Sequence, residues 1–255
     1  MTGGASGIGA ATATRFAAEG ASVVIADIDD ARGEAVVEEI RDAGGTACYA
    51  RVDVTDRKAV RRMVHDAQGA AGALDVLFNN AMTSPSESYS DDERWDLMIE
   101  SGLSAYWAAG VEAAQVMAAA GRGGAIVNNA SIAGARMGID FASEGYSAAK
   151  AGVVGLTRKL AKRFGPDGVR VNCICPGIIE TPRWRGAGAQ EPEFARRYRL
   201  MAPLGRFGRA EEVASLVRFL ASAEAAFITA QDIAIDGGFT TAARFEAVDF
   251  GPAPI

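Results

Sequence analysis

The chain alternates between short apolar runs and longer segments in which apolar and polar positions recur with a helical period. The apolar runs are ASVVIAD, LDVLFNN, GAIVNNAS, VRVNCICPG and DIAID. Helices are expected over residues 8–19, 31–43 and 56–71, each followed by a glycine, which ends helices because it adopts the left-handed conformation at low cost. A longer helical segment, residues 91–120, contains Gly102 and Gly110, which are expected to interrupt it.

The apolar runs are nearly continuous, without the alternation that marks a strand with one face in water. Such strands are buried on both faces, which is typical of a parallel sheet between two helix layers. The 255 residues are 49% hydrophobic, with no internal repeat, low-complexity segment or linker, which suits one domain with a large core. We therefore predict a single α/β domain over residues 1–255, a Rossmann-like doubly wound fold with a mostly parallel sheet and helices on both faces.

Charge and cysteine content exclude several classes of protein. A formal net charge of −6 argues against a nucleic-acid partner, which normally needs a basic surface. No apolar run approaches the roughly 18 residues of a membrane span, and no signal peptide is visible. Cys173 and Cys175 would point to one face of a strand, outside disulfide geometry, and the single histidine, His65, leaves no zinc-ligand spacing. We expect a cytoplasmic protein with no metal site and no membrane partner.

The stretch TGGASGIG near the start of the chain has the composition of a phosphate-binding turn. Gly3, Gly7 and Gly9 would let the backbone approach a phosphate where a helix begins. Asp27 ends the run SVVIAD eighteen residues after Gly9, and a carboxylate there can accept hydrogen bonds from both ribose hydroxyls of an adenosine. Alone, Asp27 is equally an ordinary aspartate at a strand end; together with the glycines it indicates a dinucleotide site.

Three further residues form a candidate acid–base set. Tyr146 and Lys150 stand four apart in YSAAK, so on a helix they share a face. A lysine ammonium beside a phenol favours the phenolate and equips the tyrosine for general acid–base catalysis. Ser131, at the end of GAIVNNAS, adds a hydroxyl for a substrate oxygen. Each signal is weak alone, because tyrosine and lysine often share this spacing by chance and a serine at a strand end is commonly a turn residue.

Together these motifs resemble those of the classical short-chain dehydrogenases/reductases over essentially the whole chain. The matching segments, in chain order, are the TGxxxGxG loop (2–9), the adenine-contacting pair Asp53 and Val54, NNA (79–81) at the end of the fourth strand, the set Ser131, Tyr146 and Lys150, the nicotinamide-covering loop PGIIET (176–181), and DGG (236–238) at the end of the last strand. Six modest motifs in the right order identify the chain as a member of this family.

The resemblance implies a mechanism. Tyr146 would donate or accept the proton at the substrate oxygen, Ser131 would orient that oxygen, and Lys150 would bind the nicotinamide ribose and favour the phenolate. Thr181 and the backbone near Ile179 would hold the carboxamide, and the hydride chemistry belongs to the cofactor. The implied cofactor-binding residues are Gly3, Ser6, Gly7, Ile8, Gly9, Asp27, Ile28, Asp53, Val54, Asn80, Ala81, Tyr146, Lys150, Pro176, Gly177, Ile179 and Thr181.

Two residues depart from the family pattern at the site. Met82 replaces the glycine that usually follows NNA, which puts a bulky side chain near the cofactor. Gly102 stands where the family has an asparagine that supports a water-mediated proton relay. The hydroxyl of Ser101 or Ser104 is a candidate to hold that water instead. Both departures put the rate in question, not the fold.

The third departure is the absence of a strand before the glycine loop, where only Met1 and Thr2 stand. In this family that strand lies at the sheet's centre, between SVVIAD and LDVLFNN. Each of its hydrogen bonds contributes about 1 kcal/mol to stability, and each of its buried apolar side chains contributes about 1.5–3 kcal/mol. Summed over the strand, these contributions exceed the roughly 5–15 kcal/mol by which a domain is stable. We therefore expect the first strand to be missing from this sequence, with roughly six to twelve further residues before Met1 in the natural chain.

The remaining candidates have mostly structural explanations. His65 is interpreted as a surface residue of a helix. The segment of about 182–205, which in this family covers the substrate, carries an arginine cluster. This cluster either forms a solvated helix face or attracts an anionic substrate. Trp184 and Met201 either belong to a lid over the substrate or pack against the rest of the domain. That cluster consists of Arg183, Arg185, Arg196, Arg197 and Arg199.

Apolar residues of the long helical segment and of the tail favour assembly. In the segment they are Leu103, Tyr106, Trp107 and Val111, and in the tail Phe245, Val248 and Phe250. In this family the long helix usually forms a dimer face, and exposed apolar area usually marks an interface. We expect a homotetramer or a homodimer.

The sequence thus predicts an NAD-dependent enzyme that interconverts a secondary alcohol and a ketone, with a small-molecule substrate that no motif names. Ser6, and not a basic residue, precedes Gly7, and with Asp27 this favours NAD over NADP. Two alternatives stay open: a catalytically weak NAD-binding protein, which Met82 and Gly102 support, and a family enzyme acting on a carbon–nitrogen bond.

Overall fold

The computed structural model describes residues 1–139, 142–182, 196, 198 and 201–241. The strands are β1 (Ser22–Asp27), β2 (Thr46–Arg51), β3 (Val76–Asn79), β4 (Gly124–Asn129), β5 (Val169–Pro176), β6 (Ile179–Glu180), β7 (Gly208–Arg209) and β8 (Asp232–Ile235). The helices are α1 (Gly7–Ala18), α2 (Asp30–Asp42), α3 (Arg57–Ala71), α4 (Asp91–Ile99), α5 (Ala105–Ala120), α6 (Ile132–Ala135), α7 (Glu144–Phe164) and α10 (Ala210–Ala221), with the π-helical segment η1 (Glu100–Ser104) and the 3₁₀ turns η2 (Gly165–Asp167) and η3 (Ala223–Ala225).

The main strands run parallel. β1 pairs with β2, and β3, β4, β5 and β8 pair in that order. Between β1 and β3 lie Met1 and Thr2: Ala26 N–H donates to the Met1 carbonyl at 2.9 Å, and Thr2 N–H donates to the Phe78 carbonyl at 3.0 Å. The backbone of these two residues therefore links the two parts of the sheet, at the position that the family resemblance gives to a first strand.

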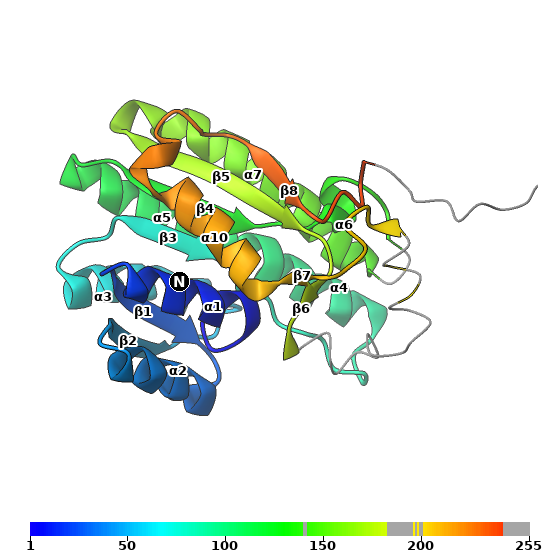
Figure 1. Cartoon of the computed structure of the whole chain (residues 1–255), viewed down its shortest axis with the longest axis horizontal. Helices are drawn as coiled ribbons and strands as arrows, with labels where there is room; N and C mark the ends of the chain where they lie inside the picture. Colours follow the sequence, from blue (N-terminus) through cyan, green and yellow to red (C-terminus); the bar gives the residue numbers. More distant parts are fainter. Residues whose placement is uncertain (140–141, 183–195, 197, 199–200, 242–255) are drawn as a thin grey trace, which may run out of the picture.

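Helices cover both faces of the sheet, as Figure 1 shows, with α1, α2 and α10 on one face and α3, α5 and α7 on the other. Neighbouring residues of the central strands serve the two faces in turn: Ile126 packs among side chains of α3, α5 and α7, whereas Val127 packs under α10. Both are fully buried, and burial stabilises a side chain of this size by about 1.5–3 kcal/mol. The predicted Rossmann-like doubly wound arrangement is confirmed.

Two details of the sequence prediction were incomplete. Strand β2 was not predicted, because TACYAR is an edge strand whose one fully buried residue is Ala47, so it has no apolar run. The predicted interruption of the long helix at Gly102 takes the form of η1, a π-helical turn between α4 and α5. Gly110 does not interrupt α5; there its missing side chain lets Leu160 approach, with a methyl group 3.0 Å from where a Cβ would stand.

Candidate active site

The glycine loop turns the chain from Thr2 into α1. Gly3 (φ 66°) and Gly7 (φ 53°) adopt left-handed backbone conformations, which only glycine tolerates cheaply. A Cβ on Gly9 would lie 1.9 Å from the carbonyl oxygen of Gly3, so the first helical turn packs directly on the loop. The amide groups at the start of α1 and the positive end of its dipole make this a place for a phosphate.

The end of β3 fixes this loop. Thr2 Oγ1 accepts hydrogen bonds from the backbone N–H groups of Asn80 (2.9 Å) and Ala81 (3.1 Å), while Asn80 Nδ2 donates to the carbonyls of Thr2 (3.2 Å) and Gly3 (3.0 Å). The NNA motif therefore acts on the loop through Asn80, and two segments nearly eighty residues apart form one rigid corner.

Asp27 closes the loop on the other side. Its carboxylate accepts hydrogen bonds from Ala5 N–H (3.0 Å), Ile28 N–H (2.8 Å) and Asp29 N–H (3.2 Å). A carboxylate has about four acceptor positions, so one bond from the glycine loop and two from the residues just after β1 occupy most of them. Asp27 thus has a structural role that the sequence did not reveal, and it has less capacity for ribose hydroxyls than a free strand-end aspartate.

The residues of the candidate acid–base set come from two elements. Ser143 caps α7 by accepting a hydrogen bond from Tyr146 N–H at 3.2 Å, and the helix carries Tyr146 and Lys150 on one face. Ser131 lies two residues after β4, as the N-cap of α6, where its Oγ accepts from Ala133 N–H at 3.1 Å. Since that bond uses a lone pair, the Ser131 hydroxyl still has its proton to donate.

Lys150 is held from two sides. Its side chain is buried in the cleft wall, at 3% exposure. Its ammonium donates to the backbone carbonyl of Asn129 at 2.7 Å and to the phenol oxygen of Tyr106 at 3.2 Å. Nζ lies 4.8 Å from the centre of the Tyr106 ring and 5.8 Å from that of Tyr146, so two phenol rings lie close to the ammonium.

A buried chain of amides supports this wall from below. Asn79 Nδ2 donates to Asn128 Oδ1 (2.9 Å) and to the Tyr106 carbonyl (3.3 Å), and Asn128 Nδ2 donates to Thr157 Oγ1 (2.9 Å). Asn79, Asn128 and Thr157 are each at most 1% exposed. Polar groups buried this deeply hold their partners in fixed positions because a broken bond there is costly, and so they tie β3, β4, α5 and α7 together.

One cleft of about 770 Å³ joins the glycine loop to the candidate acid–base set. Of the residues predicted from the sequence, all but Gly9 line it. They are Gly3, Ser6, Gly7, Ile8, Asp27, Ile28, Asp53, Val54, Asn80, Ala81, Ser131, Tyr146, Lys150, Pro176, Gly177, Ile179 and Thr181. Gly9 is buried beneath the loop. The cleft lies at the carboxyl ends of the strands, where ligands bind in open parallel sheets.

The segment after β5 forms one wall of the cleft. Ile178 N–H donates to the phenol oxygen of Tyr198 at 2.8 Å, and the Tyr198 ring stacks on Phe239 with centroids 4.9 Å apart. Asp236, in the DGG motif, accepts from Gly238 N–H and Thr240 N–H and so folds the turn that carries Phe239. The motif therefore supports the PGIIET segment from behind.

The two departures from the family pattern touch each other. A Cβ placed on Gly102 would lie 2.8 Å from Cε of Met82 and 3.2 Å from Cβ of Ala149. The space of a side chain at position 102 is thus taken by the thioether of Met82, which also lines the cleft. Ser101, a predicted holder of a relay water, is fully buried and donates its hydroxyl to the Leu97 carbonyl at 2.7 Å.

The structure places the remaining residues that the sequence singled out at the surface, in the core or outside the described residues. His65 is exposed on α3, with Nε2 2.9 Å from the Glu112 carboxylate, as a surface helix residue would be. Of the long-helix residues, Tyr106 and Val111 are buried while Trp107 is 41% exposed. Arg196 and Met201 are exposed. The other members of the arginine cluster, Trp184, and the tail residues Phe245, Val248 and Phe250 lie outside the described residues.

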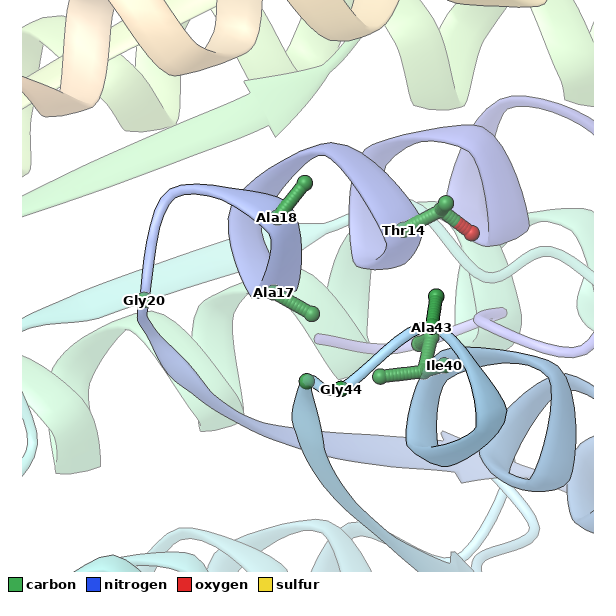
Figure 2. Close-up of a pocket in the computed structure, with 8 residues that line it drawn as sticks. Thr14, Ala17, Ala18, Gly20, Ile40, Ala43 and Gly44 are labelled. Atoms are coloured by element: carbon green, nitrogen blue, oxygen red, sulfur yellow. The ribbon is translucent and has the colours of Figure 1, made fainter.

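Figure 2 shows a second hollow, of about 240 Å³, between the C-terminal parts of α1 and α2. It is lined by small and apolar residues: Thr14, Ala17, Ala18, Gly20, Ile40, Ala43, Gly44 and Gly45. None of these described residues carries a charge, and we assign no chemistry to the hollow. No helix in the described part of the chain is both long and apolar enough to cross a membrane.

Sequence reasoning missed two residues of the site. Tyr106 was assigned to the core or a dimer face, although it stands one helical turn after Gly102, the position of the expected relay residue, and therefore on the same helix face. Asn129 was not singled out. Its backbone carbonyl accepts from Lys150, its Nδ2 donates to Asn80 Oδ1 at 2.8 Å, and its Oδ1 is enclosed without a hydrogen-bond partner.

These features fit a dinucleotide. The glycine loop lines the cleft without side chains at Gly3 and Gly7, so its backbone is open to a ligand. There is no room for a side chain at Gly3, because a Cβ there would lie 2.8 Å from the Ala81 backbone. Asn129 Oδ1 offers an unused acceptor at the cleft wall, and a buried polar atom of this kind calls for a partner. The glycine loop and Asn129 line the same cleft.

Known proteins resemble the chain over nearly its full length. A family model described as enoyl-(acyl carrier protein) reductase matches residues 3–240. A cis-4-hydroxycyclohexanecarboxylate dehydrogenase of Sinomonas cyclohexanicum is 42% identical over 244 residues, covering 94% of this chain and 95% of that protein. A cyclohexanol dehydrogenase of Acinetobacter is 38% identical, covering 94% of each. A crystal structure of a short-chain type dehydrogenase/reductase from Mycobacterium marinum superposes with a TM-score of 0.87 at 32% identity, covering 95% of this chain and 94% of that one.

Proposed function

Because the chain belongs to the short-chain dehydrogenase/reductase family, we propose that it is an NAD-dependent oxidoreductase that interconverts a secondary alcohol and a ketone. The observation that carries the proposal is one cleft lined both by the glycine loop and by Ser131, Tyr146 and Lys150. The relatives named above are dehydrogenases of secondary alcohols, which supports the reaction type.

The acid–base work falls to Tyr146. In oxidation its phenolate oxygen accepts the hydroxyl proton of the alcohol, and in reduction its phenol donates that proton to the ketone oxygen. Ser131 orients the same substrate oxygen by donating its hydroxyl proton, which the bond accepted from Ala133 N–H leaves available. The Lys150 ammonium favours the phenolate of Tyr146 by its charge, and the backbone of Asn129 keeps that ammonium at the cleft wall.

The rest of the cleft would hold the cofactor. The loop at Gly3 to Ile8 would hold the pyrophosphate, Asp27 and Ile28 the adenosine ribose, and Asp53 and Val54 the adenine. Asn80, Ala81, Lys150 and the segment from Pro176 to Thr181 would hold the nicotinamide half. When bound, the nicotinamide ring supplies the site that takes up or gives the hydride. A negative carboxylate at Asp27 favours NAD, because a 2′-phosphate beside it is repelled.

We propose an alcohol on a six-membered ring as the substrate class. Two of the similar proteins act, by their names, on cyclohexanol and on a hydroxycyclohexane carboxylate. Apolar side chains, including those of Met98, Ile139 and Ile178, also line the cleft, which suits a carbocyclic ring. The covering segment, about 182–205, would add further contacts.

We also expect a homodimer or homotetramer in the cytoplasm. Trp95 of α4 and Trp107 of α5 are 46% and 41% exposed, and large aromatic side chains exposed on adjoining helices favour a self-association surface. Light scattering at micromolar concentration checks the assembly, and a monomeric mass would contradict it. The location rests on the three cysteines, all of which have free thiols, a state that persists in reducing compartments.

The rival proposal is a weak enzyme that binds NAD, and the contact between Met82 and Gly102 is the observation that favours it. The deciding experiment is turnover of cyclohexanol, 4-hydroxycyclohexanecarboxylate and a set of acyclic alcohols and amines with NAD, alongside NAD binding by calorimetry. Turnover of a cyclic alcohol supports the proposal. Binding without turnover of any alcohol supports the rival, and turnover confined to amines supports an enzyme for carbon–nitrogen bonds.

A further inference from the structure

Tyr106 makes a contact to the acid–base set that its place in a packed helix does not require. Tyr106 is 1% exposed, yet its hydroxyl reaches the Lys150 ammonium, accepting from Nζ at 3.2 Å and donating to the Asn129 carbonyl at 3.3 Å. Lysine, phenol and carbonyl thus form a closed triangle, because Nζ also donates to the same carbonyl at 2.7 Å.

We propose that Tyr106 is a positioning residue that holds the Lys150 ammonium in its charged form at the cleft wall, in place of the water that an asparagine at position 102 would support. This inference rests on the proposed function, since it assigns a task to the lysine of the acid–base set. It adds a residue from α5 to a set made of the N-cap of α6 and two residues of α7.

The physical reason is the burial of the lysine. A buried ammonium loses water, which favours its neutral form, and acceptors within hydrogen-bond distance restore the charged form. The backbone carbonyl of Asn129 and the phenol oxygen of Tyr106 accept hydrogen bonds from Nζ. The ionisable phenols of Tyr106 and Tyr146 also face it. Burial, and next the nearby Tyr146, raise the pKa of the Tyr106 phenol, so this phenol keeps its proton and serves as a neutral partner.

The surroundings of Gly102 explain why a second partner is needed. Met82 Cε occupies the space of a side chain at position 102, and the Ser101 hydroxyl is bound to the Leu97 carbonyl. Tyr106, one turn further along the same face, is the residue of this helix that reaches Nζ. A phenol is longer than an asparagine side chain, and its direct contact leaves no gap for a water between the two groups.

The test compares the protein with Tyr106→Phe, which keeps the ring and removes the hydroxyl. The chain has four lysines, Lys58, Lys150, Lys159 and Lys162, and all but Lys150 are exposed. Lysine labelled with carbon-13 at Cε therefore gives a resolved signal for Lys150 with three internal references. Tyr89→Phe, at an exposed tyrosine, is the matched control, and Tyr106→Met is a second variant without the hydroxyl.

We expect the Lys150 signal to titrate at a pH lower by at least about half a unit in Tyr106→Phe than in the unaltered protein. The three reference lysines and the Tyr89→Phe protein should not shift. The alkaline limit of kcat/KM for alcohol oxidation should move down by the same amount, whereas a merely structural role would lower activity equally at every pH.

An unchanged titration of Lys150 in both hydroxyl-free variants overturns the inference. The titration needs no turnover, so a protein that oxidises no alcohol would defeat the proposed function while the Lys150 signal still decides the role of Tyr106. Conversely, normal turnover with an unshifted signal would leave the proposed function standing and remove Tyr106 from it.

Discussion

Replacing Gly102 tests whether Met82 and Gly102 act as one unit. The perturbation is a double-mutant cycle of Gly102→Ala and Met82→Ala. In the unaltered protein the added Cβ would stand 2.8 Å from Met82 Cε and 3.2 Å from Ala149 Cβ. Because Cε is the end of a flexible side chain, the cost lies at the low end of the range for overpacking, about 1 kcal/mol. The exchange of glycine for alanine within a helix contributes about 1 kcal/mol in the opposite direction.

The net change in the free energy of unfolding for Gly102→Ala alone is therefore about 0 kcal/mol, because the two effects offset each other. In the Met82→Ala background the closest neighbour is gone, and the same substitution should stabilise the protein by up to about 1 kcal/mol. The coupling energy between the two positions should then be about 1 kcal/mol. Urea unfolding of the four proteins measures it, at one fixed protein concentration because assembly would change the apparent stability.

Additive effects, with a coupling energy below about 0.5 kcal/mol, would refute the reasoning and show that Met82 moves aside freely.

The contact between Met82 and Gly102 also affects the expected activity of variants. Gly102→Asn alone should not raise kcat/KM, because Met82 blocks the amide, whereas Gly102→Asn combined with Met82→Gly provides the room. Higher activity in the single variant would contradict this account of the site.

Three further predictions follow from other contacts. NAD should exceed NADP in kcat/KM by at least about tenfold, and Asp27→Asn should reduce that ratio because it removes the charge facing the ribose; equal use of both cofactors by the unaltered protein would rule out this role. Gly9→Ala should abolish NAD binding, because its Cβ would lie 1.9 Å from a backbone oxygen of the loop, whereas Gly69→Ala, with no neighbour within 4 Å, should bind NAD normally; normal binding by both would contradict the account of the loop. The Arg206 guanidinium, with a further bond from a backbone N–H, lowers the pKa of Glu212 from 4.5 to about 2. The ionised Glu212 therefore contributes to the free energy of unfolding above pH 4.5, and this contribution is lost as pH falls toward 2. Since these side chains are 49% and 31% exposed, the difference in stability between the protein and Glu212→Gln should be only about 1 kcal/mol at pH 7 and should vanish near pH 2 in thermal melts; a constant difference would contradict this.

Much of the fold could be predicted because buried parallel strands leave a clear signal. Runs such as GAIVNNAS and VRVNCICPG are apolar throughout since both faces are covered, and β4 and β5 form where they stand. Strand β2 has no such signal, because TACYAR lies at the edge of the sheet with one covered residue. The π-helical form of η1 could not be read from a glycine, which is compatible with several kinds of helix irregularity.

The candidate site could be located because its motifs end parallel strands, and those ends meet at one edge of the sheet. What could not be predicted are contacts between side chains far apart in the sequence. Met82 and Gly102 were each visible as departures, but their contact depends on how η1 lies against the end of β3. Tyr106 was visible as an apolar helix residue, and only the position of Lys150 across from it reveals the role of its hydroxyl.

The most direct test of the central claim is the activity of Tyr146→Phe, measured together with NAD binding. The variant keeps the ring in the cleft and removes the proton that the substrate oxygen exchanges. With cyclohexanol as the first substrate, kcat/KM should fall by at least about a hundredfold, the low end for the loss of a general acid or base, while the Kd for NAD stays nearly unchanged. A Tyr146→Phe protein that keeps most of its activity would show that the proton transfer takes place elsewhere and would contradict the account.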